Sequence, residues 1–241
     1  MKTVILFGAS SAIAQSYVNH LNQQATQFNI ICVSSSNIEY NDDKVTYFYS
    51  DYSAQSLNEL AQSLKSQQIE LAQVIIFNGQ LHNDQHMPEK KLEEINSDYF
   101  MQLLHSNTLV PLLCLQSIVP LLNHKTHCTI TALSARVGSI NDNKLGGWYT
   151  YRASKSALNM LFKTAAIELA RRAKNTKLVL FHPGTTDTQL SKPFQKNVPA
   201  DKLFTPDFVA QQLFKFTYEN PQLELNGEPA YLDWQGNTIK W

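Results

Sequence analysis

The chain has 241 residues, with 20 lysines and arginines balanced by 20 aspartates and glutamates. This length fits one α/β domain covering residues 1–241, and a hydrophobic fraction of 43% excludes a disordered chain. A formal net charge of zero provides no broad attraction to nucleic acid or to an anionic membrane, so we expect neither partner. Only eight residues are glycine, and each is expected where a side chain fits poorly.

Short apolar runs alternate with amphipathic helical patterns along the chain. Strands are expected at 3–7, 30–33, 45–49, 74–77, 129–133, 178–181 and 230–232. Helices are expected from the serines at 10 and 11 to about residue 22, around 57–64, over 98–122 with a bend at Pro111, over 151–173 and over 208–218. This order predicts a Rossmann-like, doubly wound parallel sheet of about seven strands with helices on both faces. Ligands of such sheets bind beyond the carboxyl ends of the strands.

The cysteines and histidines give no sign of a metal or redox centre. Cys32, Cys114 and Cys128 lie in apolar runs without a CxxC pair, which indicates buried reduced thiols. His82 and His86 have helical spacing but no third ligand, so we expect no metal. No apolar stretch approaches about 18 residues and the N-terminus lacks a secretory pattern, so we expect a cytoplasmic protein with no membrane contact.

The first strand leads into a candidate phosphate loop. Gly8 ends the strand, and Ser10, Ser11, Ala12 and Ile13 stand at the start of the expected helix. Backbone N–H groups at such a helix start can bind a pyrophosphate. Only the first of three possible loop glycines is present, so the loop by itself predicts phosphate binding and an ordinary turn about equally.

The end of the second strand bears on the choice of cofactor. It reads Val33-Ser34-Ser35-Ser36-Asn37, with no carboxylate to bind a ribose 2′-hydroxyl. This absence favours NADP over NAD, with Ser35 as the expected contact, because a carboxylate would repel the 2′-phosphate. The arginine that often binds that phosphate is also absent, and serines in a turn need no functional explanation, so NAD remains the alternative.

Tyr151 and Lys155 stand one helical turn apart, a spacing that carries little weight by itself. The surroundings of this pair are more informative. Ser134 follows the expected strand that precedes the pair in the chain, and Pro183-Gly184 follow the expected strand after the pair. A free tyrosine has a pKa near 10, so a nearby ammonium group is the kind of neighbour that would adapt it to acid–base work.

Together these elements resemble the short-chain dehydrogenase/reductase family over essentially the whole chain. They are the Gly8 loop, Asp51, Asn78-Gly79, Asn107, Ser134, Tyr151-x-x-x-Lys155 and Pro183-Gly184-x-x-x-Thr188. The runs 134–140 and 146–155 are similar to the C-factor and sniffer-like carbonyl reductase branch.

The resemblance implies an NAD(P)(H)-dependent reduction of a ketone or aldehyde to an alcohol. Tyr151 would donate the proton, and Lys155 would favour its phenolate and hold the nicotinamide ribose. Asn107 would support Lys155 through a water, and Ser134 would bind the substrate carbonyl. The residues implied to bind the cofactor are Gly8, Ser10, Ser11, Ala12, Ile13, Ser35, Asp51, Asn78, Gly79, Tyr151, Lys155, Pro183, Gly184, Thr185 and Thr188.

The serine has three candidate positions. Family members commonly carry two adjacent serines here, of which the second is catalytic, whereas this chain has Ser134-Ala135. Alignment on Gly138 places Ala135 at the catalytic position, and a small shift places Ser134 there. We favour Ser134, with Ser139 as a third candidate.

Other functions and features remain open at this point. A cofactor-binding signalling or sensor protein of the C-factor type, with little turnover, is the alternative function. A methyltransferase would explain the Gly8 loop but neither the Tyr/Lys pair nor Pro183-Gly184. The segment 186–205 is predicted to be a mobile lid, and its apolar content suggests a hydrophobic substrate. By resemblance, a homodimer or homotetramer is expected.

Overall fold

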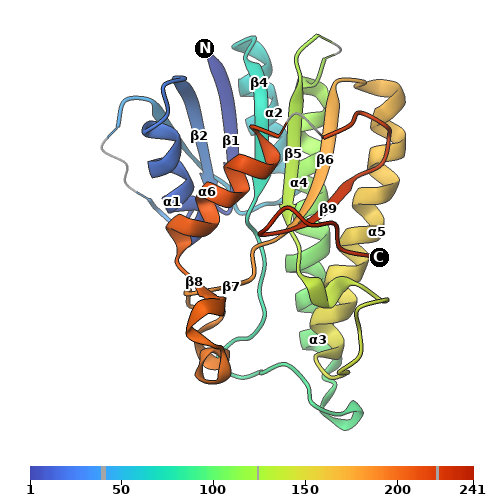
Figure 1. The fold of residues 1–241 in the computed structure, drawn as a ribbon. Coiled ribbons are helices and arrows are strands. Elements are labelled where there is room, and N and C mark those ends of the chain that lie inside the picture. The colour runs from blue at the N-terminus through green and yellow to red at the C-terminus, as the bar shows by residue number, and fades with distance from the viewer. Residues whose placement is uncertain (39–41, 124, 221–222) are drawn as a thin grey trace.

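The centre of the computed structural model is a seven-stranded parallel sheet (Figure 1). The structure describes residues 1–38, 42–123, 125–220 and 223–241. The strands of this sheet are β1 (Lys2–Phe7), β2 (Phe28–Ser34), β3 (Val45–Tyr49), β4 (Glu70–Ile76), β5 (Cys128–Leu133), β6 (Thr176–His182) and β9 (Ala230–Asp233). They lie in the order β3-β2-β1-β4-β5-β6-β9, and every neighbouring pair is parallel. The predicted doubly wound fold is therefore confirmed.

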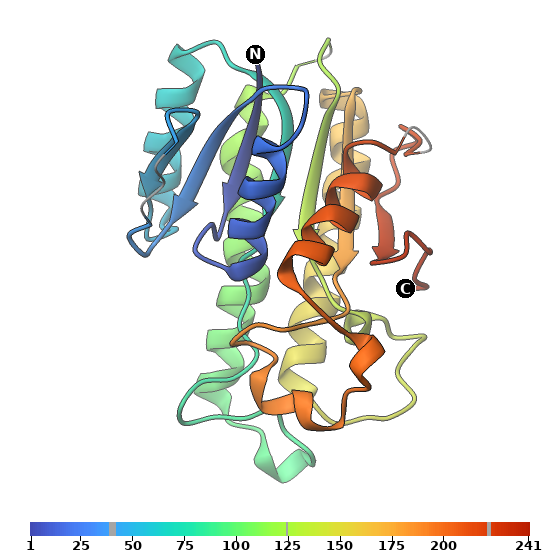
Figure 2. The ribbon, with the colours of Figure 1, turned by 60° about the vertical axis from the view of Figure 1, so that its left-hand side comes forward.

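Helices cover both faces of the sheet and enclose two apolar cores (Figures 1 and 2). Helices α1 (Ala12–Asn22) and α6 (Pro206–Thr217) pack on one face. Helices α2 (Ala54–Ser66), α4 (Val110–Ile118) and α5 (Tyr149–Arg172) pack on the other. Because both faces are covered, the strands are almost continuously apolar, which is why short runs identified them.

The chain changes direction between β1 and β4, which are neighbours at the centre of the sheet. After β1 it builds β2 and β3 on one side, then crosses to β4 and builds the other side. Such a switch point leaves a crevice at the carboxyl ends of the two central strands. Gly8 follows β1 and Asn78 closely follows β4, so both lie beside this crevice.

The long helix predicted over 98–122 is interrupted. It consists of α3 (Ser97–Leu104), a π-helical turn (His105–Leu109), α4 and a 3₁₀ turn (Val119–Leu121). Pro111 has no N–H to donate to the carbonyl of Asn107, which explains why the wider turn falls just before it. Within the described residues, the stretch Ser97–Leu121 is long and apolar enough to cross a membrane by length and composition alone, and half of its most apolar window is buried inside the protein.

A second region extends below the strand ends (Figure 2). In it, β7 (Thr185–Thr186) pairs with β8 (Leu203–Phe204), closing the base of the predicted lid. Between them lie two 3₁₀ turns, Lys192–Asn197 and Ala200–Lys202. The predicted lid is thus a folded loop beside the strand ends, and its mobility stays a prediction.

Candidate active site

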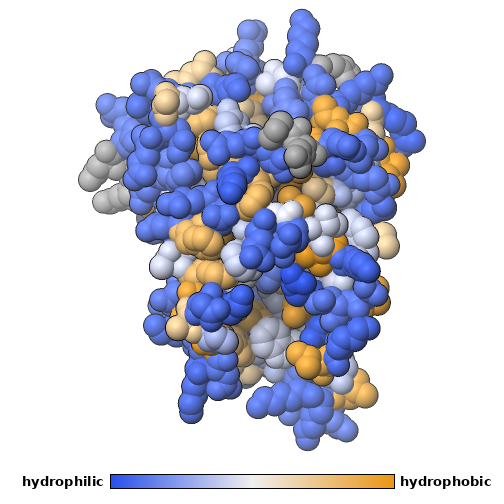
Figure 3. Space-filling view, viewed as in Figure 1, coloured by the Kyte–Doolittle hydropathy of each residue, from blue (hydrophilic) through white to orange (hydrophobic). Residues whose placement is uncertain are grey.

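A hollow of about 770 Å³ opens at the carboxyl ends of the central strands. The surface in Figure 3 is indented between the lid and the lower part of α5. Of the predicted residues, the hollow is lined by Ser10, Ser11, Ala12, Ile13, Asn78, Gly79, Ser134, Tyr151, Lys155, Pro183, Gly184, Thr185 and Thr188. Gly8, Ser35, Asp51 and Asn107 do not line it. None of the described lining residues is an aspartate or glutamate.

Gly8 makes the tight turn that brings α1 to the hollow. Its φ is +72°, and a Cβ there would lie 2.9 Å from the backbone nitrogen of Asn78. Both the left-handed backbone and the contact with the neighbouring chain require glycine. The Gly8 N–H donates to the Tyr52 hydroxyl at 2.9 Å, and that hydroxyl donates to the Val33 carbonyl at 3.1 Å. Tyr52 is not among the residues expected from the sequence, because its partners lie far from it in the chain.

The start of α1 has the donors that a phosphate needs. Ser11 is its N-cap, and the Ser11 hydroxyl accepts the Ala14 N–H at 3.2 Å. The other N–H groups of the first turn have no partner within the helix. Together with the positive end of the helix dipole, they favour an anion at this place.

Two predicted cofactor contacts lie outside the enclosed hollow. Ser35 is exposed on the bend after β2. Asp51 is exposed after β3, where its carboxylate accepts the Ser53 N–H at 2.9 Å, and Ser53 itself caps α2. Hydrogen bonding to Ser53, first through its side chain and then through its N–H, lowers the pKa of Asp51. Their binding roles remain predictions.

Lys155 is a buried cation, only 3% exposed. Its Nζ donates to the carbonyl of Leu133 at the end of β5, at 2.8 Å. Desolvation lowers the pKa of Lys155 to about 8. A Cβ on Gly79 would lie 3.3 Å from this Nζ, so the glycine leaves room for the ammonium group.

Tyr151 stands one turn before Lys155 and is 8% exposed. The Lys155 Nζ lies 5.8 Å from the centre of the Tyr151 ring. Burial, and then the nearby Tyr231 hydroxyl, raise the pKa of Tyr151, so the phenol holds its proton. The structure therefore brings a protonated phenol and a buried ammonium group to the same side of the hollow.

The three candidates for the serine have different surroundings. The Ser134 hydroxyl donates to Oδ1 of Asn159 at 2.6 Å, within the protein. Ala135 packs in the same buried cluster as Tyr151. Ser139 accepts the Asp142 N–H at 3.1 Å and does not line the hollow. Both Ser134 and Ala135 line the hollow, and the catalytic role of Ser134 stays a prediction.

The Asn107 side chain is hydrogen-bonded to the segment that follows β4. Its Oδ1 accepts the Gln80 N–H at 2.6 Å, and its Nδ2 donates to the Gln80 carbonyl at 2.8 Å. The same Nδ2 donates to the Ser154 hydroxyl at 3.0 Å. The side chain thus holds the Gly79-Gln80 segment against α5, one residue before Lys155.

The segment after β6 closes the other side of the hollow. Gly184 has a φ of +73°, and a Cβ there would lie 2.6 Å from the ring of Phe204. His182 Nδ1 and Thr186 Oγ1 are buried and have no hydrogen-bond partner in the described part of the chain. The free helix N–H groups, threonine hydroxyls and Lys155 ammonium, without a carboxylate, form a donor set that fits a phosphate-bearing dinucleotide.

The lid contributes an aromatic wall. Phe194 packs on Trp148, with ring centres 5.0 Å apart, and on His82 at 5.8 Å. The His82 ring also lies within hydrogen-bond distance of the Leu190 carbonyl, and His86 stacks on Tyr99. No group of three possible metal ligands was found among the described residues.

Two curated relatives match much of this chain. A 1-hydroxy-2-glutathionyl-2-methyl-3-butene dehydrogenase of Rhodococcus sp. (strain AD45) is 28% identical over 243 residues, covering 100% of both chains. The C-signal protein of Myxococcus xanthus is 33% identical over 135 residues, which cover 56% of this chain and 74% of that protein.

Solved structures share the whole fold. The carbonyl reductase Sniffer of D. melanogaster has a TM-score of 0.83 at 18% identity, with 100% of both chains covered. An NADPH-bound carbonyl reductase from chicken fatty liver has a TM-score of 0.78 at 19% identity, covering 99% of this chain and 98% of that one. The family profile described as short chain dehydrogenase matches residues 2–199, which include the Gly8 turn and the Tyr151–Lys155 pair. The chain, as its resemblance to the C-factor and sniffer-like branch predicted, belongs to the short-chain dehydrogenase family of oxidoreductases.

Proposed function

We propose that this protein is an NADP(H)-dependent oxidoreductase that reduces a ketone or aldehyde to an alcohol. The observation that carries the proposal is the single hollow shared by the start of α1, the phenol of Tyr151 and the ammonium group of Lys155. A phosphate-binding helix start and an acid–base pair are the two parts that such a reaction needs on one protein.

The chain's own residues handle the proton and the orientation of the substrate. When bound, the nicotinamide supplies or accepts the hydride. Tyr151 donates its proton to the carbonyl oxygen of the substrate, and the nearby Lys155 ammonium stabilises the phenolate that remains. Asn107 maintains the Gly79-Gln80 segment beside that ammonium group. Leu133, through its carbonyl, fixes the direction of the lysine side chain.

NADP is the proposed cofactor because no carboxylate directly follows β2. The bend Ser34–Ser36 is held by a hydrogen bond from the Ser36 N–H to the Ser34 hydroxyl at 3.0 Å. Hydroxyl groups can donate hydrogen bonds to a 2′-phosphate, whereas a carboxylate would repel it. The NADPH-bound carbonyl reductase of the same fold supports this choice.

The proposed substrate is apolar. Leu81, Ala135, Val137, Trp148 and Phe194 line the hollow on the side of Tyr151. Apolar and aromatic walls of this kind bind a ligand mainly by excluding water. Benzaldehyde and small aryl ketones are therefore suitable first substrates.

The test replaces Tyr151→Phe and measures binding and turnover separately. NADPH and NADH are each titrated into the protein while tryptophan fluorescence is recorded, because Trp148 lines the hollow. Turnover of a carbonyl panel is then followed by NADPH absorbance. We expect NADPH to bind more tightly than NADH, and Tyr151→Phe to bind NADPH while losing turnover by at least about 10³-fold.

Tyr99→Phe is the matched control. Tyr99 packs in the same cluster as Tyr151, but its hydroxyl has no hydrogen-bond partner in the described structure. This variant should keep its turnover. Undiminished turnover in Tyr151→Phe would exclude the proposed acid–base role.

A nucleotide-dependent signalling or sensor function is the second candidate. Ala135, which packs in the cluster of Tyr151, has no hydroxyl, and the C-signal protein is among the relatives. Saturable NADPH binding without turnover of any carbonyl in the panel would favour this candidate over the enzyme.

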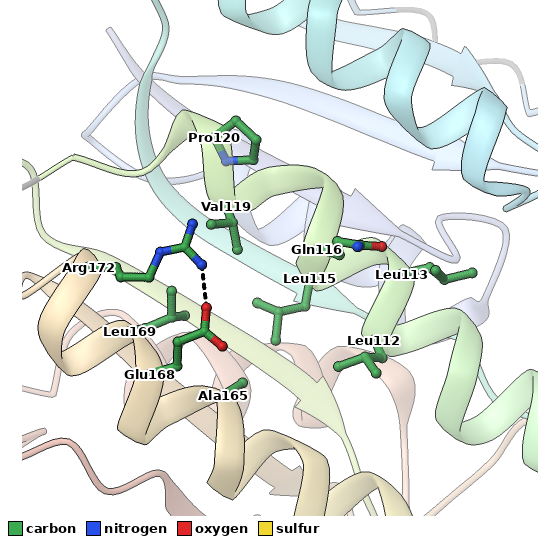
Figure 4. Close-up of a pocket in the computed structure, with 10 residues that line it drawn as sticks. All are labelled: Leu112, Leu113, Leu115, Gln116, Val119, Pro120, Ala165, Glu168, Leu169 and Arg172. Atoms are coloured by element: carbon green, nitrogen blue, oxygen red, sulfur yellow. Dashed lines mark hydrogen bonds and ion pairs between the residues drawn. The ribbon is translucent and has the colours of Figure 1, made fainter.

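We also propose that the protein forms a homo-oligomer through α4 and α5. An open groove of about 470 Å³ lies between these helices, with an apolar floor and the Glu168–Arg172 ion pair at one side (Figure 4). Met160 and Ile167 are exposed on α5. Sedimentation analysis should show a dimer or tetramer that Ile167→Asp shifts toward the monomer. A monomeric wild-type protein at micromolar concentration would refute this assembly.

We propose a cytoplasmic location, and the state of the three cysteines supports it. Cys32, Cys114 and Cys128 are buried and form no disulfide among the described residues. Burial raises the pKa of the Cys114 and Cys128 thiols, so these two remain protonated and unreactive. Detection of the protein in a membrane or secreted fraction would contradict the proposal.

A further inference from the structure

Helix α5, which carries Tyr151 and Lys155, begins without a capping side chain of its own. Its N-cap residue is Trp148, which has a left-handed backbone with φ of +54° and makes no side-chain capping bond. The first turn contains no acidic residue. Helices α1, α2, α3 and α6 are instead capped by a serine, asparagine or threonine directly before each helix. The N–H groups at the start of α5 therefore need an acceptor from elsewhere.

Glu89 provides that acceptor from the segment after β4, 61 residues before Thr150 in the chain. Its Oε2 accepts the Thr150 N–H at 3.2 Å, and its Oε1 accepts the Thr150 hydroxyl. Its backbone carbonyl accepts the N–H of Trp148. Glu89 is only 4% exposed. A carboxylate at the positive end of a helix is favourable, and hydrogen bonds to an ionised group are among the stronger ones.

The segment around Glu89 packs against the wall that holds Tyr151. A Cβ on Gly147, whose φ is +66°, would lie 3.3 Å from the Glu89 carbonyl oxygen, so the two segments are in close contact. Desolvation, and then the charge of Glu89, raise the pKa of Tyr99 to about 12. Tyr99 belongs to the buried cluster that contains Tyr151. Glu89 thus holds the start of α5, and its charge acts on the Tyr99 phenol in α3.

We propose that Glu89 is a positioning residue for Tyr151, because its hydrogen bonds fix the residue at which α5 begins. Thr150 directly precedes Tyr151, so losing both bonds to Thr150 loosens the turn that carries the phenol. Lys155 lies one turn deeper and has a separate partner in the Leu133 carbonyl. Loss of Glu89 should therefore lower kcat more than it weakens NADPH binding. The catalytic part of this inference rests on the proposed function.

Two substitutions separate the hydrogen bonds from the charge. Glu89→Gln can still accept the Thr150 N–H with its oxygen and donate to the Thr150 hydroxyl with its nitrogen. Glu89→Ala removes both partners. We expect kcat to fall about 10- to 100-fold in Glu89→Ala, with the KM for NADPH unchanged within about threefold, and most of the activity to return in Glu89→Gln. Glu94→Ala is the control, since this exposed carboxylate accepts the Lys90 N–H in the same segment.

Amide hydrogen exchange gives a readout that does not require turnover. Exchange at Thr150 and Tyr151 should be about ten times faster in Glu89→Ala than in the wild type, and close to the wild type in Glu89→Gln. If Glu89→Ala does not fold, Thr150→Val, which removes only the hydroxyl donor, should show a smaller change in the same direction.

Three results would overturn the inference. They are unchanged exchange at the start of α5 without the Glu89 side chain, faster exchange with unchanged kcat, and equal losses of kcat in the Gln and Ala variants. A wild-type protein that reduces no carbonyl would instead contradict the proposed function, and the exchange measurement would still decide whether Glu89 sets the start of α5.

Discussion

Replacing Ser134→Ala distinguishes a structural serine from a catalytic one. The Ser134 hydroxyl donates to Asn159 Oδ1 at 2.6 Å, and both side chains are buried. Removing the donor leaves a buried amide oxygen short of a partner, which costs about 1–3 kcal/mol of stability. A hydroxyl that donates to the reacting carbonyl oxygen would instead affect the rate, and its loss would lower kcat by roughly 10²–10³-fold.

From the observed hydrogen bond we expect a loss of stability of about 1–2 kcal/mol, with kcat within about threefold of the wild type. Chemical unfolding measures the first quantity and NADPH oxidation with a carbonyl substrate measures the second. Ser139→Ala is the control, because Ser139 is also buried but its hydroxyl accepts the Asp142 N–H outside the hollow. If turnover by Ser134→Ala were slower by roughly 100-fold or more while its stability stayed unchanged, this reasoning would be refuted and the catalytic serine restored.

Three further changes test other parts of the site. Ala135→Ser adds a hydroxyl to the lining of the hollow, within the cluster of Tyr151, and should raise kcat/KM about tenfold; a lower value would show that position 135 does not contact the carbonyl. Gly79→Ala places a methyl 3.3 Å from the Lys155 Nζ and should lower kcat about tenfold, whereas unchanged kinetics would contradict the tight fit. Lys155→Met should abolish turnover yet raise the free energy of unfolding at pH 7 by roughly 1–3 kcal/mol, because it removes a charge that desolvation disfavours. Between about pH 8 and pH 10.5 the Lys155 side chain binds fewer protons in the folded than in the unfolded chain, so its contribution to stability should rise with pH. The stability of the wild type relative to Lys155→Met should therefore increase across this range, and a constant difference would exclude this contribution of Lys155.

The sheet was predictable because most of its strands are buried on both faces and so leave a local apolar signature, the edge strand β3 being the exception. The least complete prediction was β4, expected at 74–77 and observed at Glu70–Ile76. Gln73 concealed its first half, since a glutamine is unusual in a buried strand. In the structure Gln73 accepts the Tyr17 hydroxyl at 2.6 Å and donates to the Thr217 hydroxyl at 2.9 Å. Partners this far apart in the chain leave no trace in a local pattern.

The site was predictable as a set of residues but not as a set of orientations. The sequence predicted Tyr151 and Lys155 beside the start of α1 at the strand ends, and in the structure all of them line one hollow, while their catalytic roles stay predictions. It did not decide which of Ser134 and Ala135 faces Tyr151, because the alternation of a strand is lost where the strand ends. Tyr52 and Glu89 escaped notice for another reason, since each acts on a partner from a distant segment.

The charges of the hollow lead to a last consequence for ligand binding. Arg136 lines it but is paired with Asp233 at 3.1 Å, whereas Lys155 has only the Leu133 carbonyl as a hydrogen-bond partner in the described structure. Burial of this ammonium group therefore lowers the stability of the folded chain, and no carboxylate among the described lining residues offsets that loss. A ligand that brings negative charge and hydroxyl acceptors near Lys155 raises its pKa again and recovers part of that cost. The thermal stabilisation by NADPH should consequently be larger in the wild type than in Lys155→Met, and equal shifts would show that the cofactor does not approach this lysine.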